Sequence, residues 1–97
     1  MNIILLPPSD KELSEAISYY NQQWPSLGDN FYKEFIAVCR VLSSYPDTWR
    51  KIGTNTRKIN FKRFPYLVLY VLDGEDIFVT CIAHQHRAPE YYIDRIY

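Results

Sequence analysis

Residues 57–83 read RKINFKRFPYLVLYVLDGEDIFVTCIA, and this stretch decides the fold. Residues 57–62 alternate between polar and apolar, as in a strand with one buried face. Residues 66–72 are apolar at every position, as in a strand covered on both faces, and residues 77–83 are rich in β-branched and aromatic side chains. Asp73–Asp76 between them is typical of a hairpin turn. We therefore predict three consecutive strands that form an antiparallel meander.

The residues before this stretch predict one short strand and two helices. Residues 2–6 are an apolar run, and residues 9–24 and 28–44 each carry apolar side chains at helical spacing. Two helices joined by so short a turn are expected to form an antiparallel hairpin. Packing that hairpin on one face of the sheet buries all the apolar stripes. The prediction is an α+β fold in a single domain, residues 1–97, with the helices on one face of the sheet.

Polar residues at the predicted helix ends suggest how each helix begins. Ser9 and Glu12 fit the capping box, in which a hydroxyl and a carboxylate each accept a hydrogen bond from a backbone N–H of the first turn. Ser26 or Asp29 is expected to cap the second helix. Pro89 is expected to begin a short helical turn in the tail.

Charge is unevenly distributed in a chain whose formal net charge is zero. Residues 50–72 contain six basic residues and no acidic one, while the flanking residues carry an excess of acids. The neutral total argues against a protein that coats nucleic acid through bulk electrostatics. The basic segment is either a local patch for an anionic partner or a solvated strand and loop, and the sequence leaves both open.

Cysteine usage and hydropathy predict a cytoplasmic protein. Cys39 and Cys81 lie in apolar runs, as small buried residues do in a reducing compartment. No signal peptide and no apolar run of membrane-spanning length is recognisable. His84 and His86 lack a Cys or paired-carboxylate partner at metal-binding spacing, so we expect no metal and no cofactor.

The residues after the last predicted strand concentrate polar chemistry. Cleavage of RNA needs a base for the 2′-hydroxyl, cations for the phosphate and an acid for the leaving oxygen. Candidates for these roles follow residue 83 and lie on the neighbouring strands: His84, His86, Arg87, Tyr91, Tyr92, Arg95, Arg57, Lys58, Lys62 and Arg63. The same His-x-His-Arg pattern is more often a hydrogen-bonded corner than a catalytic centre. Packing is likewise the default expectation for the aromatic side chains, Trp24 and Trp49 included.

Three segments together resemble a known family. They are Tyr19-Tyr20 with residues 27–31, residues 57–70 with their Arg-Phe-Pro-Tyr sequence, and residues 82–92 with Arg95. In combination they are similar to the RelE/ParE superfamily of type II toxins, often called plasmid stabilisation proteins. The resemblance covers nearly the whole chain and agrees with the predicted order of elements.

The resemblance implies a toxin that is neutralised by a cognate antitoxin, and it implies two alternative targets. RelE-like members cleave messenger RNA on the ribosome without a metal, which would make His84, Arg87, Arg57 and Tyr91 catalytic. ParE-like members share the fold but poison DNA gyrase. Under either alternative we expect binding contacts from Lys58, Lys62, Arg63, His86, Tyr92 and Arg95. The zero net charge and the sequence Ile82-Ala83-His84 favour the gyrase inhibitor, and an inactive module that only binds antitoxin is a third alternative.

Overall fold

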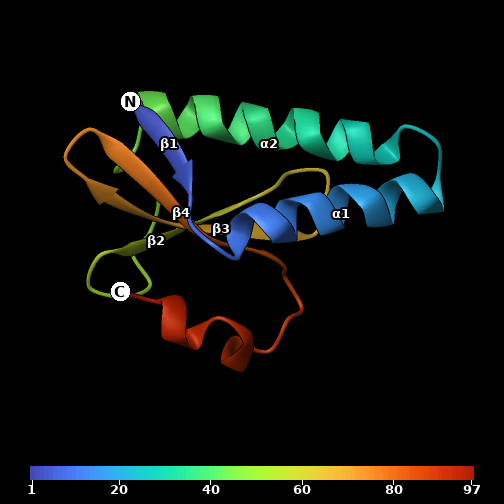
Figure 1. The fold of residues 1–97 in the computed structure, drawn as a ribbon. Helices are drawn as coiled ribbons and strands as arrows, with labels where there is room; N and C mark the ends of the chain where they lie inside the picture. The colour runs from blue at the N-terminus through green and yellow to red at the C-terminus, as the bar shows by residue number, and fades with distance from the viewer.

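The computed structural model describes residues 1–97 and contains two helices and four strands (Figure 1). In chain order these are β1 (Asn2–Leu5), α1 (Ser9–Gln23), α2 (Leu27–Ser44), β2 (Thr56–Asn60), β3 (Tyr66–Asp73) and β4 (Asp76–His84). Two short 3-10 helices follow, η1 (Pro89–Tyr91) and η2 (Ile93–Arg95). The predicted α+β class is confirmed, and every predicted helix and strand ends within two residues of its observed end.

The four strands form one sheet in the order β1-β4-β3-β2. The meander of β2, β3 and β4 is antiparallel, as predicted, but β1 lies parallel to β4, so the complete sheet is mixed. The backbone N–H groups of Asn2 and Leu6 donate to Glu75 and Val79 on the β4 side. Since N–H groups alternate in direction along a strand, those of Ile3 and Leu5 point to the open edge of the sheet.

The helical hairpin covers one face of the sheet, which we call the helix face. Its core consists of the buried side chains Ala16, Phe31, Phe35, Val38, Leu42, Ile59, Phe61, Phe64, Val68, Tyr70, Ile77, Val79 and Ile82. Phe31 is fully buried at its centre, with its ring 4.8 Å from that of Phe61 and 4.9 Å from that of Tyr66. Gly28 lets the helices approach closely, because a Cβ there would lie 2.1 Å from the carbonyl oxygen of Ile17.

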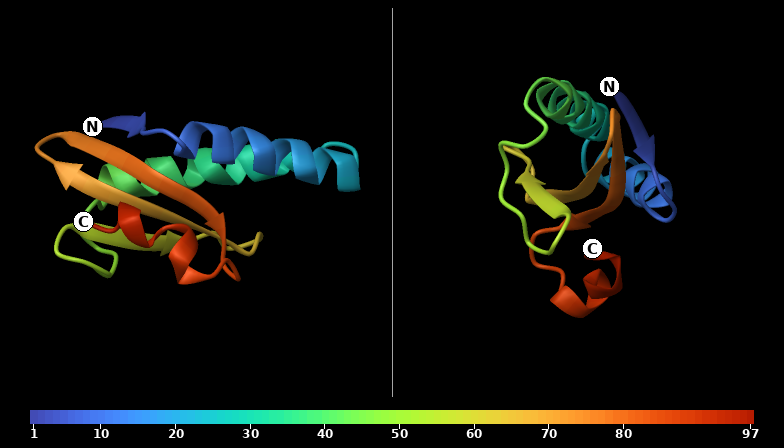
Figure 2. Two further views of the ribbon diagram at one scale, coloured as in Figure 1. Left: turned by 60° about the horizontal axis from the view of Figure 1, so that its bottom comes forward. Right: turned by 90° about the vertical axis from the view of Figure 1, so that its left-hand side faces the viewer.

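The tail, residues 85–97, covers the opposite face, which we call the tail face (Figure 2). Four side chains are buried there, Leu67, Leu69, Cys81 and Ala83, and Ile52, Tyr92 and Ile96 pack against them. The carbonyl oxygen of Tyr97 accepts hydrogen bonds from the N–H groups of Asn55 and Thr56. The tail is therefore fixed to the strand β2 at its end, as Figure 1 also shows.

The structure corrects three predictions about local contacts. The capping box is wrong, because the Ser9 hydroxyl donates to the carbonyls of Leu6 and Val79 and Pro8 occupies the cap position. Ser26 does cap α2 by position, but it adopts a left-handed φ of 69° and its side chain makes no capping bond. Trp24 is not packed in the core, since 71% of it is exposed at the tip of the hairpin.

Both cysteines are free thiols, and burial raises their pKa values. The pKa of the buried Cys81 is raised to about 12 and that of the half-buried Cys39 to about 11. Each thiol therefore stays protonated at neutral pH in the folded protein. Neither α1 nor α2 has the length and apolar character needed to cross a lipid bilayer.

Candidate functional site

A buried carboxylate on α1 organises the most polar cluster of the molecule. The side chain of Glu12 is only 6% exposed. Its Oε1 accepts hydrogen bonds from the backbone N–H of Ile82 at 3.0 Å and from Nη1 of Arg95 at 3.0 Å. Its Oε2 accepts from Nη2 of Arg95 at 2.9 Å and from the hydroxyl of Tyr91. One carboxylate thus connects α1, β4 and the tail.

Arg95 completes this connection from the tail. Its two Nη atoms meet the two oxygens of Glu12 side by side, which is the strongest geometry for such a pair. Nη1 also donates to the carbonyl of Thr80 at 2.9 Å. The hydrogen bonds with Glu12 raise the pKa of Arg95, and the hydrogen bond with Glu12 likewise raises the pKa of Tyr91. Arg95 therefore stays charged and Tyr91 stays protonated at neutral pH, so both remain hydrogen-bond donors to Glu12.

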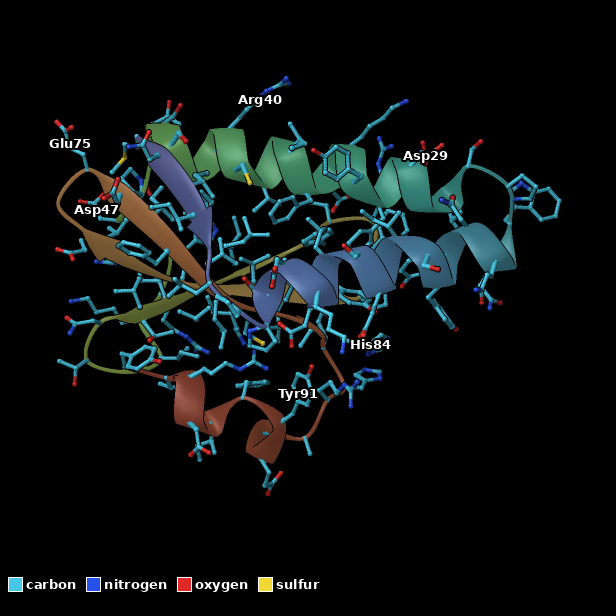
Figure 3. All side chains as sticks on the ribbon, viewed as in Figure 1. Asp29, Arg40, Asp47, Glu75, His84 and Tyr91 are labelled. Atoms are coloured by element: carbon cyan, nitrogen blue, oxygen red, sulfur yellow. The ribbon has the colours of Figure 1, made fainter.

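A cavity of about 220 Å³ opens beside this cluster, between α1 and the end of β4. It is lined by Glu12, Glu15, Ala16, Tyr19, Tyr66, Ile82, Ala83, His84, Arg87 and Tyr91. Figure 3 places His84 and Tyr91 on this side of the molecule, facing the region between α1 and the tail. The cavity therefore brings together three of the four predicted catalytic residues, namely His84, Arg87 and Tyr91.

The polar atoms that border the cavity differ in whether they are already paired. The Tyr91 hydroxyl donates to Glu12, but the Arg87 guanidinium makes no hydrogen bond and lies 4.2 Å above the Tyr91 ring. Nδ1 of His84 accepts the backbone N–H of His86 at 3.1 Å, which places the proton of a neutral His84 on Nε2. Burial raises the pKa of Tyr66 and the Arg87 charge opposes that shift, so the hydroxyl of Tyr66 remains a donor.

Arg57 lies apart from this cavity. Its Nη1 donates to the carbonyls of Asp47, at 3.1 Å, and Trp49, at 2.7 Å. It is paired in register with Tyr70, whose hydroxyl donates to the carbonyl of Pro46 in the same loop. Arg57 therefore fixes the loop after α2, and the structure does not bring it together with His84.

The basic residues between β2 and β3 border a second, separate cavity. It has a volume of about 580 Å³ and is lined by Leu27, Asn30, Lys33, Glu34, Ala37, Lys62, Arg63 and Phe64. The carboxylate of Glu34 accepts hydrogen bonds from the backbone N–H groups of Lys62 and Arg63. Lys62 and Arg63 form no ion pair, so their side chains remain available to an anionic partner.

The other predicted binding residues are spread over the molecule. Lys58 is half-buried on β2, on the opposite face of the sheet from the buried Ile59. His86 is exposed beside His84, with its ring 5.1 Å away. Tyr92 packs on the tail face, in agreement with the expectation that aromatic residues serve packing. Arg95 binds Glu12.

Sequence reasoning assigned Glu12 the wrong partners and missed its central position. One signal was present: Glu12 stands four residues before the buried Ala16, on the apolar side of the helix. A carboxylate on an apolar stripe is costly unless it is paired. The side chains that bind it, Tyr91 and Arg95, lie 79 and 83 residues away in the tail, and no local pattern connects them with Glu12.

Comparisons with known proteins agree on one family. Residues 3–89 match the family model described as the ParE toxin of the type II toxin–antitoxin system parDE. The chain is 28% identical to Toxin ParE2 of two Mycobacterium tuberculosis strains, CDC 1551/Oshkosh and H37Rv, over 82% of this chain and 77% of the relative. It is similar to a solved structure of a chromosomal ParDE system from P. aeruginosa, with a TM-score of 0.73, 14% identity, and coverage of 87% of this chain and 95% of that one.

Proposed function

This chain belongs to the family of ParE toxins of type II toxin–antitoxin systems, and from that premise we propose that it stops growth by inhibiting DNA gyrase in the cytoplasm. A cognate antitoxin would hold it inactive until the antitoxin is lost. The toxin would then act by binding its target, with no covalent chemistry of its own.

The separation of the candidate catalytic residues carries this proposal. A nuclease needs its base and its phosphate-binding cations within hydrogen-bond reach of one reacting phosphate. Arg57 is committed to two loop carbonyls, and the Tyr91 hydroxyl is committed to Glu12. Only His84 and Arg87 remain available at one cavity. An arrangement this incomplete fits a toxin that acts through contacts better than one that cleaves RNA.

The exposed apolar surface of the helical hairpin supports an antitoxin as partner. Large apolar side chains of the hairpin face solvent, with Trp24 71% and Tyr45 63% exposed, together with Tyr19, Tyr32 and Val41. The open edge of β1 lies beside α2 and offers unpaired backbone groups. Aromatic patches and free sheet edges are typical docking sites for a partner's helix or extended segment.

The gyrase assignment is tested with purified toxin in two parallel assays. We expect the protein to inhibit supercoiling by purified gyrase and to cause cleaved DNA to accumulate, while a cell-free extract continues to translate. His84→Ala should keep this inhibition. Ile93→Asp should weaken it about tenfold, because Ile93 is a large apolar side chain that is 57% exposed on the tail, and a charge there would be costly to bury against the target.

Each alternative predicts a different pattern. Rapid cleavage of ribosome-bound messenger, lost in His84→Ala and Arg87→Ala, would establish the RelE-like nuclease and give those two residues catalytic roles. Inactivity in both assays, with antitoxin binding intact, would establish an inert antitoxin-binding module. The candidate antitoxin is a small protein encoded next to the gene for this chain. Co-expression with that protein should yield a stable complex and relieve growth arrest. If neither result is obtained, the antitoxin part of the proposal fails.

A further inference from the structure

We propose that the cavity between α1 and the end of β4 is a receptor for one carboxylate side chain of a protein partner, and that this partner is the antitoxin. The inference rests on the proposed function, since it requires that an antitoxin exists. It assigns the cavity a ligand class and a role in neutralisation.

Unpaired donors converge on the cavity. Four groups on its lining can donate and have no partner within the protein: the Nε2–H of His84, the guanidinium of Arg87 and the hydroxyls of Tyr19 and Tyr66. No buried side-chain nitrogen or oxygen lacks a partner anywhere in the molecule, so these donors are reached from solvent. The two carboxylates of the lining have other partners, since Glu12 binds Arg95 and Tyr91 and Glu15 pairs with Lys11 at 3.8 Å. Donors that no internal acceptor engages fit an acceptor that arrives from outside, and a carboxylate is the protein side chain that only accepts.

The geometry keeps these donors in place before a ligand binds. The ring of His84 lies 5.5 Å from that of Tyr66, and the His86 N–H fixes its tautomer. Arg87 rests on the Tyr91 ring, which Glu12 in turn holds through its hydroxyl. Ordered donors lose little conformational entropy on binding, which favours affinity. The charge of Glu12 is already matched by Arg95, so it does not oppose an incoming anion as a free carboxylate would.

The surroundings favour a single carboxylate over a nucleic acid. Glu15 borders the cavity, and the exposed Glu90 and Asp94 lie on the adjacent tail. A phosphate chain leaving the cavity would meet these acids, and the protein has no excess positive charge to compensate. A peptide with one acidic residue flanked by basic ones would instead find complementary charges on the rim.

The position of the cavity favours the antitoxin over the target. Tyr19 forms part of its wall and is also part of the exposed apolar surface of the hairpin, which we assign to antitoxin docking. A segment that packs against Tyr19 on α1 therefore reaches the cavity directly. The carboxylate would fix the position of the antitoxin segment along the toxin surface, while the apolar contacts would provide most of the affinity.

The test measures the affinity of full-length antitoxin for toxin variants released from the complex. Arg87→Gln should weaken binding about tenfold or more, and Tyr66→Phe about fivefold, as expected for a charge-assisted and a neutral hydrogen bond. Arg50→Gln is the matched control, because Arg50 is an exposed arginine in the loop between α2 and β2, outside both the hairpin and the cavity, and this variant should bind within about twofold of wild type. Arg87→Glu should be rescued by changing one acidic residue of the antitoxin to Lys, which would identify the carboxylate.

Two results would overturn the inference. Wild-type affinity in both Arg87→Gln and Tyr66→Phe would exclude a carboxylate in this cavity. Loss of gyrase inhibition with unchanged antitoxin affinity would assign the cavity to the target. If wild-type toxin forms no antitoxin complex at all, the proposed function itself fails, and that outcome is distinct from the first two. Tyr66→Phe removes one oxygen atom only, so it remains informative if Arg87→Gln is poorly folded.

Discussion

The two faces of the sheet are closed by different means. On the helix face, thirteen buried apolar side chains from two helices, three strands and the segment between β2 and β3 form a continuous core. On the tail face, four buried apolar side chains lie under a tail that contains only short 3-10 helices and is tied down by one ion pair and a few hydrogen bonds. The stabilisation from apolar burial is shared among many side chains, whereas a hydrogen bond or an ion pair is lost when one of its atoms is removed. The helix face should therefore carry the global stability, and the tail should detach as a local unit.

The largest effect is expected at the centre of the helix face. Phe31→Ala removes a fully buried ring that contacts several aromatic neighbours. We expect a loss of about 4 kcal/mol in the free energy of unfolding, measured by denaturant titration. Tyr32→Ala, at the neighbouring exposed position, is the control and should change stability by about 0.5 kcal/mol or less. A loss below about 1 kcal/mol for Phe31→Ala would place the global core elsewhere.

Removing the ion pair should act on the tail face alone. Arg95→Ala leaves the carboxylate of Glu12 with two of its donors, so the cost should be about 2–3 kcal/mol, at or below the range for breaking a buried pair. Hydrogen exchange should become fast in the tail while α2 keeps its protection. Arg87→Ala, which breaks no ion pair, is the control. Equal loss of protection on both faces would mean that the molecule unfolds as one unit.

The two cysteines, one on each face of the sheet, allow the two faces to be compared through the pH dependence of the free energy of unfolding. Cys81 lies on the tail face, and its pKa is raised from 9.0 to about 12 by burial. Between pH 9 and 12 the unfolded chain releases the thiol proton while the folded chain retains it, so the free energy of unfolding falls as the pH rises. The slope should approach about 1.4 kcal/mol per pH unit for this thiol. Cys81→Ala should remove that part of the slope.

Cys39 provides the corresponding measurement on the helix face. Its pKa is raised from 9.0 to about 11, so its contribution should end about one pH unit earlier than that of Cys81. The comparison is made by measuring stability against pH for Cys39→Ala and Cys81→Ala. Identical slopes in wild type and both variants would contradict the burial of these thiols.

The smallest effect is expected where the tail meets the loop before β2. A Cβ at Gly53 would lie 2.6 Å from Cγ2 of Ile96 and 2.7 Å from the carbonyl oxygen of Tyr97. Because the carbonyl oxygen of Tyr97 is held by the N–H groups of Asn55 and Thr56, the end of the tail yields only at a cost, and Gly53→Ala should destabilise the protein by about 1–2 kcal/mol. Chemical-shift changes should be confined to residue 53 and the tail. Changes that extend into α1 or α2 would show that the tail is rigidly coupled to the helix face.

The same contrast explains what the sequence could predict. The helices and the meander follow from local periodicity, because each apolar stripe reports which side of its own element is buried. The parallel pairing of β1 with β4 and the contact between Glu12 and Arg95 join residues that are distant in the chain, and no local pattern specifies such partners. His84, Arg87 and Tyr91 could be grouped because they follow one strand. The position of Arg57 could not be predicted, because its hydrogen-bond acceptors are backbone carbonyls, which every sequence contains.

The mixed sheet also constrains the order of events during synthesis. β1 is synthesised before the other elements described here, yet its only strand partner is β4, and Glu12 is paired only after residue 95 has been added. Contacts of such long sequence separation form late and slowly. Until β4 and the tail have been synthesised, the nascent chain therefore holds an unpaired β1 and a solvated Glu12 carboxylate. The last contacts to form are therefore those between β1 and β4 and between Glu12 and Arg95, which complete the sheet and fix the tail.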